Sequence, residues 1–268
     1  MPRRPRSRAR FLLCAALSAG FALPAAAQTL ETETARVLPA HGWEIGYALE
    51  VQHSSEGIER AMPFALVYGI TNRLELMIEP VPYTLIRPKV GRRAKGAGDI
   101  ETTLTYNFRH ETAHLPALAI AGELKLPTAR DQLIGTGQTD VAIYVSESKH
   151  FGRLDTHAHV AYTSVGQPSG VAPLGNIFGL GLAAVYAARP RLDIFAEVLS
   201  DTASNPAGEG GSLAGTGLPV VPEASGGEFV ATVGTAWRLR PRFTVYVSGS
   251  RDNIGATLIR SGFVVHLR

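Results

Sequence analysis

Strict alternation of apolar and polar residues runs through two neighbouring stretches of the chain, 98–109 and 117–126. Within the first stretch, Leu104, Tyr106 and Phe108 alternate with hydroxyl, amide and charged side chains. A period of two predicts β-strands with one apolar face and one polar face. Each stretch holds about ten residues, enough for a tilted strand to cross a bilayer. Charged faces need water, and aromatic residues are typical of lipid-facing strands at headgroup level. The two stretches therefore predict one hairpin of a transmembrane barrel.

The chain begins with the pattern of a secretory leader. Its first ten residues contain five arginines and no acid, an apolar run covers residues 11–23, and three alanines end at Ala27. This order predicts a signal peptide over residues 1–27, followed by a single domain over residues 28–268. The only cysteine, Cys14, lies within the leader, so no disulfide is expected in the mature domain.

Charge and hydropathy narrow the class of protein further. Five of the 26 basic residues belong to the leader, so the mature domain has 21 Lys and Arg against 23 Asp and Glu. This balance gives no reason to expect a nucleic-acid partner. No run of 18 apolar residues follows the leader, so no membrane helix is expected. A cleaved leader and many alternating strands are typical of the outer membrane of a Gram-negative envelope.

The same alternation recurs along the domain and predicts an all-β fold, an antiparallel up-and-down transmembrane β-barrel of about twelve strands. The predicted strands cover residues 43–52, 62–70, 73–79, 98–109, 117–126, 141–145, 154–163, 178–186, 192–199, 229–239, 242–248 and 254–268. Connections are short after even-numbered strands and mostly long after odd-numbered ones, which is the rule for outer-membrane barrels. A soluble barrel or sandwich is the alternative. In one strand Phe195 and Leu199 share the polar face and break the pattern.

Ionisable residues on the polar faces are expected to line the lumen, because an isolated charge facing lipid is costly. The candidates are Glu44, Glu75, Asp99, Glu101, Arg109, Glu123, Lys125, Asp155, His157, His159, Arg238 and Arg242. Three of them, Glu101, Glu123 and Lys125, are expected to form a charge network that narrows the lumen. Acids at the outer strand ends would favour cations, although ordinary turn chemistry also explains them.

Two further groups of residues have both a structural and a functional interpretation. His157 and His159 share one face with Asp155 and could contact a metal, but the sequence places no further Cys or His beside them, so polar packing is expected instead. A second group, in the predicted loop 83–97, has basic side chains and no acid, and would contact either water or the phosphates of lipopolysaccharide. Its members are Arg87, Lys89, Arg92, Arg93 and Lys95.

Several short motifs together resemble one family. They are Gly96-Ala97-Gly98-Asp99-Ile100, Leu124-Lys125-Leu126-Pro127-Thr128, Gly135-Thr136-Gly137-Gln138-Thr139-Asp140, Ser148-Lys149-His150-Phe151-Gly152 and Pro190-Arg191-Leu192. In this order they resemble the MetA-pathway of phenol degradation family of putative outer-membrane proteins. The resemblance implies an outer-membrane barrel that passes aromatic or other apolar compounds, and it implies no catalytic residues. Outer-membrane proteins usually end on an aromatic residue, whereas this chain ends with Leu267-Arg268.

These observations predict a passive channel or binding conduit for small molecules, including apolar or aromatic ones. No catalytic residue, metal or cofactor is expected. The expected partners are outer-membrane lipid and lipopolysaccharide and a small-molecule solute, and a monomer is favoured over a larger assembly. Two alternatives stay open. One is a lipid-modifying enzyme, for which His53-Ser54-Ser55 resembles a catalytic His-x-Ser, and the other is a structural surface barrel.

Overall fold

The computed structural model describes residues 30–167, 174–202 and 227–267. The predicted signal peptide, residues 1–27, and most of the predicted loop 201–226 lie outside the described residues. Within the described ranges every regular element is a β-strand, and no helix could cross a membrane.

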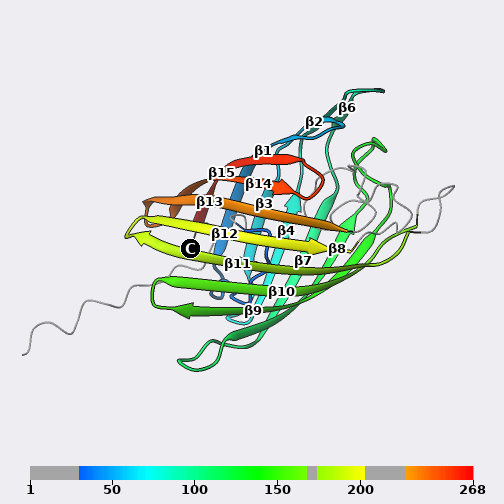
Figure 1. The fold of residues 1–268 in the computed structure, drawn as a ribbon. Helices are drawn as coiled ribbons and strands as arrows, with labels where there is room; N and C mark the ends of the chain where they lie inside the picture. Colours follow the sequence, from blue (N-terminus) through cyan, green and yellow to red (C-terminus); the bar gives the residue numbers. More distant parts are fainter. Residues whose placement is uncertain (1–29, 168–173, 203–226, 268) are drawn as a thin grey trace, which may run out of the picture.

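Twelve strands form a closed antiparallel barrel (Figure 1), which confirms the predicted fold. They are β1(Trp43–His53), β3(Phe64–Gly69), β4(Leu74–Pro80), β7(Ile100–Arg109), β8(Ala117–Leu126), β9(Asp140–Phe151), β10(Leu154–Ser164), β11(Ile177–Arg189), β12(Leu192–Asp201), β13(Glu228–Arg240), β14(Phe243–Asp252) and β15(Thr257–Leu267). The barrel closes where β1 pairs with β15, from Trp43 opposite Leu267 to His53 opposite Thr257. Closure leaves no edge of the barrel with unpaired backbone groups.

The barrel has two different ends. Connections 70–73, 110–116, 152–153, 190–191 and 241–242 lie at one end, here called the short-turn end, where β1 begins and β15 finishes. The remaining connections lie at the opposite, long-loop end. In the turn 152–153, Gly152 has a φ of 69°, a conformation that glycine adopts without the strain of a side chain.

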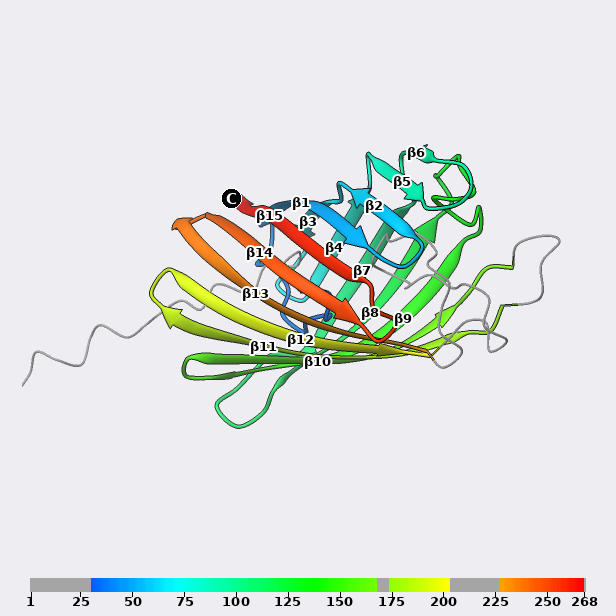
Figure 2. The same ribbon diagram turned by 45° about the horizontal axis from the view of Figure 1, so that its top comes forward.

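Three short strands form an extension at the long-loop end, where the sequence predicted loops. They are β2(Gly57–Ala61), β5(Thr84–Pro88) and β6(Ala94–Gly96). The far end of β1 pairs with β2, which pairs with β5, which pairs with β6 (Figure 2). The predicted loops 53–60 and 83–97 are therefore wrong in this respect. Segments of three to five residues are too short to show a period, and they become strands only because β1 offers them an edge.

The two faces of the barrel wall differ as the alternation predicts. On β7, Leu104 is 46% exposed on the outside whereas Thr103 is 1% exposed on the inside. Large apolar side chains are exposed in the same way on every strand of the barrel from β7 to β13. An apolar surface of this extent is suited to lipid.

The outward position of Leu104 leads to a test of the membrane-facing surface. Leu104→Arg should lower the free energy of unfolding of the lipid-refolded barrel by about 2–4 kcal/mol, because it places a charge near the middle of a lipid-facing strand. Urea unfolding in lipid vesicles measures this loss, with Leu104→Met as the control. Equal stability of the two variants would contradict the assigned facing of β7.

Candidate functional site

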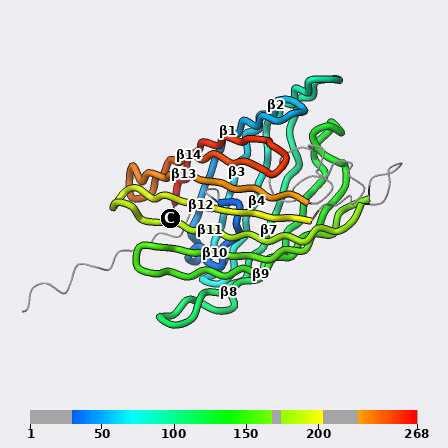
Figure 3. Tube along the Cα trace, viewed as in Figure 1, coloured from blue at the N-terminus to red at the C-terminus, as the bar shows by residue number. Residues whose placement is uncertain are grey.

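The barrel interior is occupied by the chain that precedes β1. Residues 30–42, here called the interior segment, run inside the ring of strands and reach β1 at the short-turn end (Figure 3). Leu30, Thr32, Ala35 and Leu38 are buried there. The sequence does not predict that residues 30–42 lie inside the barrel, because the segment has no period and its contacts come from distant strands.

The backbone of the interior segment is held by side chains of the wall. A buried N–H group needs an acceptor, and over residues 30–40 the segment pairs with no strand that could supply one. Carboxylate, imidazole, hydroxyl and amide groups of the wall accept instead. The pairs are Thr32 N–H to Glu197 Oε2 (2.5 Å), Glu33 N–H to His159 Nδ1 (2.9 Å), Ala35 N–H to Ser148 Oγ (2.9 Å), Leu38 N–H to Glu75 Oε2 (2.6 Å) and Ala40 N–H to Asn72 Oδ1 (2.9 Å).

The two histidines of β10 belong to this packing. Because His159 accepts at Nδ1, its neutral ring carries the proton on Nε2. His157 Nδ1 lies 2.8 Å from Ser148 Oγ, the same hydroxyl that holds Ala35. Among the described residues, no group of three or more His, Cys, Asp or Glu side chains is arranged to hold a metal.

An ion-pair cluster holds the segment near the short-turn end. Arg36 pairs with Glu111 at 2.8 Å and with Asp155 at 2.9 Å. Glu111, in the connection from β7 to β8, also lies 3.3 Å from Lys149 Nζ and accepts the N–H of His150 at 2.8 Å. Burial raises the pKa of Glu111, but hydrogen bonds from Arg36 and from the His150 N–H outweigh it, so this pKa lies below its ordinary value.

Deeper in the barrel the segment meets a buried arginine. Arg260 of β15 pairs with Glu31 of the segment, and its Nε donates to Glu50 Oε1 at 2.6 Å. Its side chain is almost buried, and a buried guanidinium is tolerated only when it is paired. The interior segment therefore supplies part of the charge that Arg260 requires.

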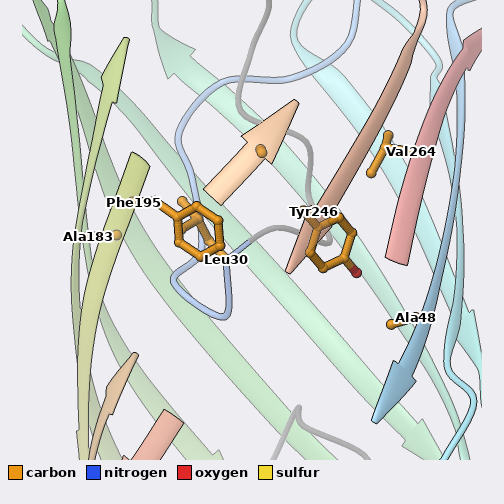
Figure 4. Packing of buried hydrophobic residues seen from close by; sticks show 7 residues of the cluster. Leu30, Ala48, Ala183, Phe195, Tyr246 and Val264 are labelled. Atoms are coloured by element: carbon orange, nitrogen blue, oxygen red, sulfur yellow. The ribbon is translucent and has the colours of Figure 1, made fainter. Parts of the chain in front are cut away.

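Apolar contacts complete the packing of the segment. Leu30 belongs to an apolar cluster on the inner face that contains Ala48, Ala183, Phe195, Ala236, Tyr246 and Val264 (Figure 4). Phe195, which breaks the alternation in the sequence, is 1% exposed and lies opposite Gly234, where a Cβ would collide with its ring. The irregularity at Phe195 thus marks a filled interior. On the opposite wall Ala35 packs against Ala117 and Ala119, and all three are fully buried.

The charge network predicted for Glu101, Glu123 and Lys125, in the half of the barrel nearer the long-loop end, takes a different form. Glu123 Oε2 accepts from Tyr144 OH at 3.2 Å and from Thr103 Oγ1 at 3.4 Å. Lys125 stands opposite Glu101 in the strand register, but its ion pair is with Asp140 of β9. The sequence does not predict this ion pair, because β8 and β9 are joined by a long connection and their register cannot be derived from it.

Two of the three predicted lumen arginines near the short-turn end have local partners. Arg238 pairs with Asp193 at 3.0 Å, Arg109 Nε donates to the Pro116 carbonyl at 3.0 Å, and Arg242 is exposed beside its turn. These three arginines do not contact the interior segment in the described residues.

Two predicted acids also have partners in the structure. Buried Glu44 pairs with His266 Nδ1 at 3.0 Å, across the seam between β1 and β15. Asp99 Oδ1 accepts the Ala129 N–H at 2.9 Å and so holds the connection that follows β8.

The basic residues of the extension are all exposed, namely Arg87, Lys89, Arg92, Arg93 and Lys95. Arg92 forms a two-pronged pair with Asp131, at 2.7 and 2.6 Å, and this hydrogen bonding lowers the pKa of Asp131 to about 2. One of the five predicted lipid-contact residues is therefore already engaged by a carboxylate of the protein.

In the His53-Ser54-Ser55 stretch, His53 ends β1 and the two serines begin the turn to β2. Ser54 Oγ accepts the N–H groups of Glu56, at 3.1 Å, and of Gly57, at 3.3 Å. Within the described residues no hydrogen bond joins His53 to either serine. The geometry shows a turn rather than a nucleophile beside its base.

Comparisons with known proteins identify the class of fold. No protein-family model and no curated protein matches the chain. Among solved structures, the COG4313 outer membrane channel from Pseudomonas putida F1 is 14% identical with a TM-score of 0.63, over 87% of this chain and 97% of that one. The NanC porin is 11% identical with a TM-score of 0.57, over 82% of this chain and 98% of that one. The KdgM porin, solved in complex with disordered oligogalacturonate, is 10% identical with a TM-score of 0.56, over 84% and 99%.

At these identities the similarity establishes the fold, and the fold is that of outer-membrane β-barrels. The resemblance to the MetA-pathway family stays a prediction.

The lowered pKa of Glu111 leads to a pH test of the cluster around Arg36. Because folding lowers this pKa from 4.5, the carboxylate stabilises the folded protein above pH 4.5, and the contribution is lost as the pH falls through the lowered value. Glu111→Gln should therefore lower the urea midpoint at pH 7 and make progressively less difference below pH 4.5. Glu56→Gln, at an exposed turn, is the control. A deficit of Glu111→Gln that is constant with pH would contradict the ion-pair role.

Proposed function

We propose that this protein is an outer-membrane channel for small solutes, held closed by its own interior segment. The observation that carries the proposal is the contrast between the two faces of the wall. Ionisable side chains such as Glu101, Glu123 and His159 lie on the inner face of strands whose outer face is apolar. Such an interior is suited to water and solutes when the segment is displaced. The solved channel and porins of the same fold support this conclusion.

The packing of the segment supports a closed state. Ala35 fills the space against β8, whereas Leu30 fills the space against β11 and β12 on another wall. These contacts leave the interior occupied at both places. A solute that passes at either place therefore requires the segment to shift.

The attachment of the segment also supports displacement. Over residues 30–40 its backbone N–H groups are bound to side chains, and side chains can turn away without breaking the barrel. Only at the end of the segment does a backbone bond to a strand follow, from His41 N–H to the Gly69 carbonyl of β3 at 2.6 Å. Its ion pairs at Glu31 and at Arg36 lie near the start and at the middle of the segment. The segment can thus detach in part while the twelve strands stay paired.

The charge of the interior indicates which solutes are favoured. Carboxylates outnumber bases among the inward side chains of the described wall. Glu50, Glu101, Glu123 and Glu197 are buried, whereas the inward bases are Lys149, which is buried, and Lys125 and Arg260, which are mostly buried. An acidic passage favours cations and repels a polyanion such as the oligogalacturonate bound to the KdgM porin. The resemblance to the MetA-pathway family adds apolar and aromatic compounds as candidates, for which the apolar inner cluster around Phe195 offers contact.

A reversible cross-link tests the closed state. Ala35 N lies 2.9 Å from Ser148 Oγ, so cysteines at these two positions are close to the spacing of a disulfide. Residues 28–268 contain no other cysteine. In a planar bilayer the oxidised Ala35→Cys, Ser148→Cys protein should conduct at least about tenfold less than the same protein after reduction, since a tethered segment cannot leave the lumen.

Each single-cysteine variant is the control, and its conductance should not respond to reduction. Equal conductance of the oxidised and reduced double variant would show that solutes pass beside a stationary segment. Absence of conductance in every form would overturn the channel itself.

The acidic wall leads to a test of selectivity. The open channel should prefer cations, and the pair Glu101→Gln and Glu123→Gln should move the reversal potential in a KCl gradient towards anions, because it removes two inward carboxylates. The exposed acid Glu56 supplies the matched control, as Glu56→Gln. An unchanged reversal potential in the double variant would show that these carboxylates do not line the path.

A further inference from the structure

The inner face of the extension carries a patch of oxygen atoms. In the strand register Gln52 of β1 stands opposite Glu59 of β2, and Ala61 of β2 stands between Glu50 of β1 and Thr84 of β5. These are neighbouring positions of one face, because residues two apart on a strand point the same way. Glu50, Gln52, Glu59 and Thr84 therefore surround the small side chain of Ala61. They are here called the oxygen patch.

Every member of the oxygen patch has a buried oxygen atom without a hydrogen-bond partner. The atoms are Glu50 Oε2, Gln52 Oε1, Glu59 Oε1 and Thr84 Oγ1. Each of the four residues is at most 8% exposed. A buried acceptor without a partner is costly, so several on neighbouring positions indicate a missing ligand rather than a packing accident.

The charges of the patch indicate the sign of that ligand. Glu50 uses its other oxygen, Oε1, for Arg260 Nε at 2.6 Å, and Arg260 is shared with Glu31. Glu59 makes no ion pair in the described residues and lies within electrostatic range of Glu50. Two carboxyl groups at neighbouring positions, with one arginine shared among three acids, form a set of oxygen atoms that suits a cation.

The donor atoms indicate which kind of cation. Two carboxylates, an amide oxygen and a hydroxyl are hard ligands, and the patch contains no imidazole or thiol that would favour zinc or copper. Half of its donors are neutral oxygens, so the patch differs from a metal site built from three or more acids or histidines. We propose that the oxygen patch binds a hard divalent cation of the Ca²⁺ or Mg²⁺ type. Bound there, the cation joins β1, β2 and β5 and fastens the extension to the barrel.

Calcium binding to the refolded full domain tests the proposal. After treatment with a chelator, the wild type should show a saturable calorimetric titration with Ca²⁺ or Mg²⁺, and the bound cation should raise its urea midpoint. Glu59→Gln keeps the size of the side chain and removes its charge, so it should weaken binding at least about tenfold. Glu56→Gln, which removes an exposed acid three residues away, should bind as the wild type does.

A second variant keeps the result interpretable. If Glu59→Gln does not refold, Thr84→Val removes one donor with little change in shape and should also weaken binding. A wild type that shows no saturable response to Ca²⁺ or Mg²⁺ would overturn the proposal, and so would equal losses in Glu56→Gln and Glu59→Gln. The measurement needs no conductance, so it is independent of the proposed channel.

Discussion

Backbone groups that lie in hydrocarbon have no water to bind, and the pairing of β1 with β15 is how this chain meets that constraint. The two strands match over the whole length of β1, from Trp43 opposite Leu267 to His53 opposite Thr257. Without that seam, two edges of unpaired N–H and C=O groups would face lipid. The antiparallel order of the strands, the outward apolar faces and the inward polar faces all depend on the closed ring that the seam creates.

The same requirement for hydrogen bonds governs the interior, where side chains meet it instead of strands. Over residues 30–40 the interior segment crosses the lumen without a strand partner, so Glu197, His159, Ser148 and Glu75 accept its N–H groups. This explains why the inner face carries acids and histidines where a solid barrel would carry apolar residues. A backbone bound to side chains can be released one contact at a time, which fits a closure that opens.

The extension and the interior segment have one feature in common. Both place carboxylates against Arg260, Glu31 from the segment and Glu50 from the strand that continues into the extension. The guanidinium of Arg260 therefore contacts both the interior segment, through Glu31, and the oxygen patch, through Glu50.

The sequence by itself determined the twelve strands of the barrel, the facing of Leu104 and Thr103, and the two ends of the barrel. Each of these follows from periods and loop lengths within a few neighbouring residues. Phe195 on the polar face indicates a filled interior, but no residue near it in the chain predicts that it packs in one cluster with Leu30. The tertiary structure alone decided that residues 30–42 occupy the lumen, that Lys125 pairs with Asp140, and that β2, β5 and β6 form an extension. These features depend on the register between strands far apart in sequence and on the closure of the ring. Local alternation of apolar and polar residues predicts neither the register nor the closure.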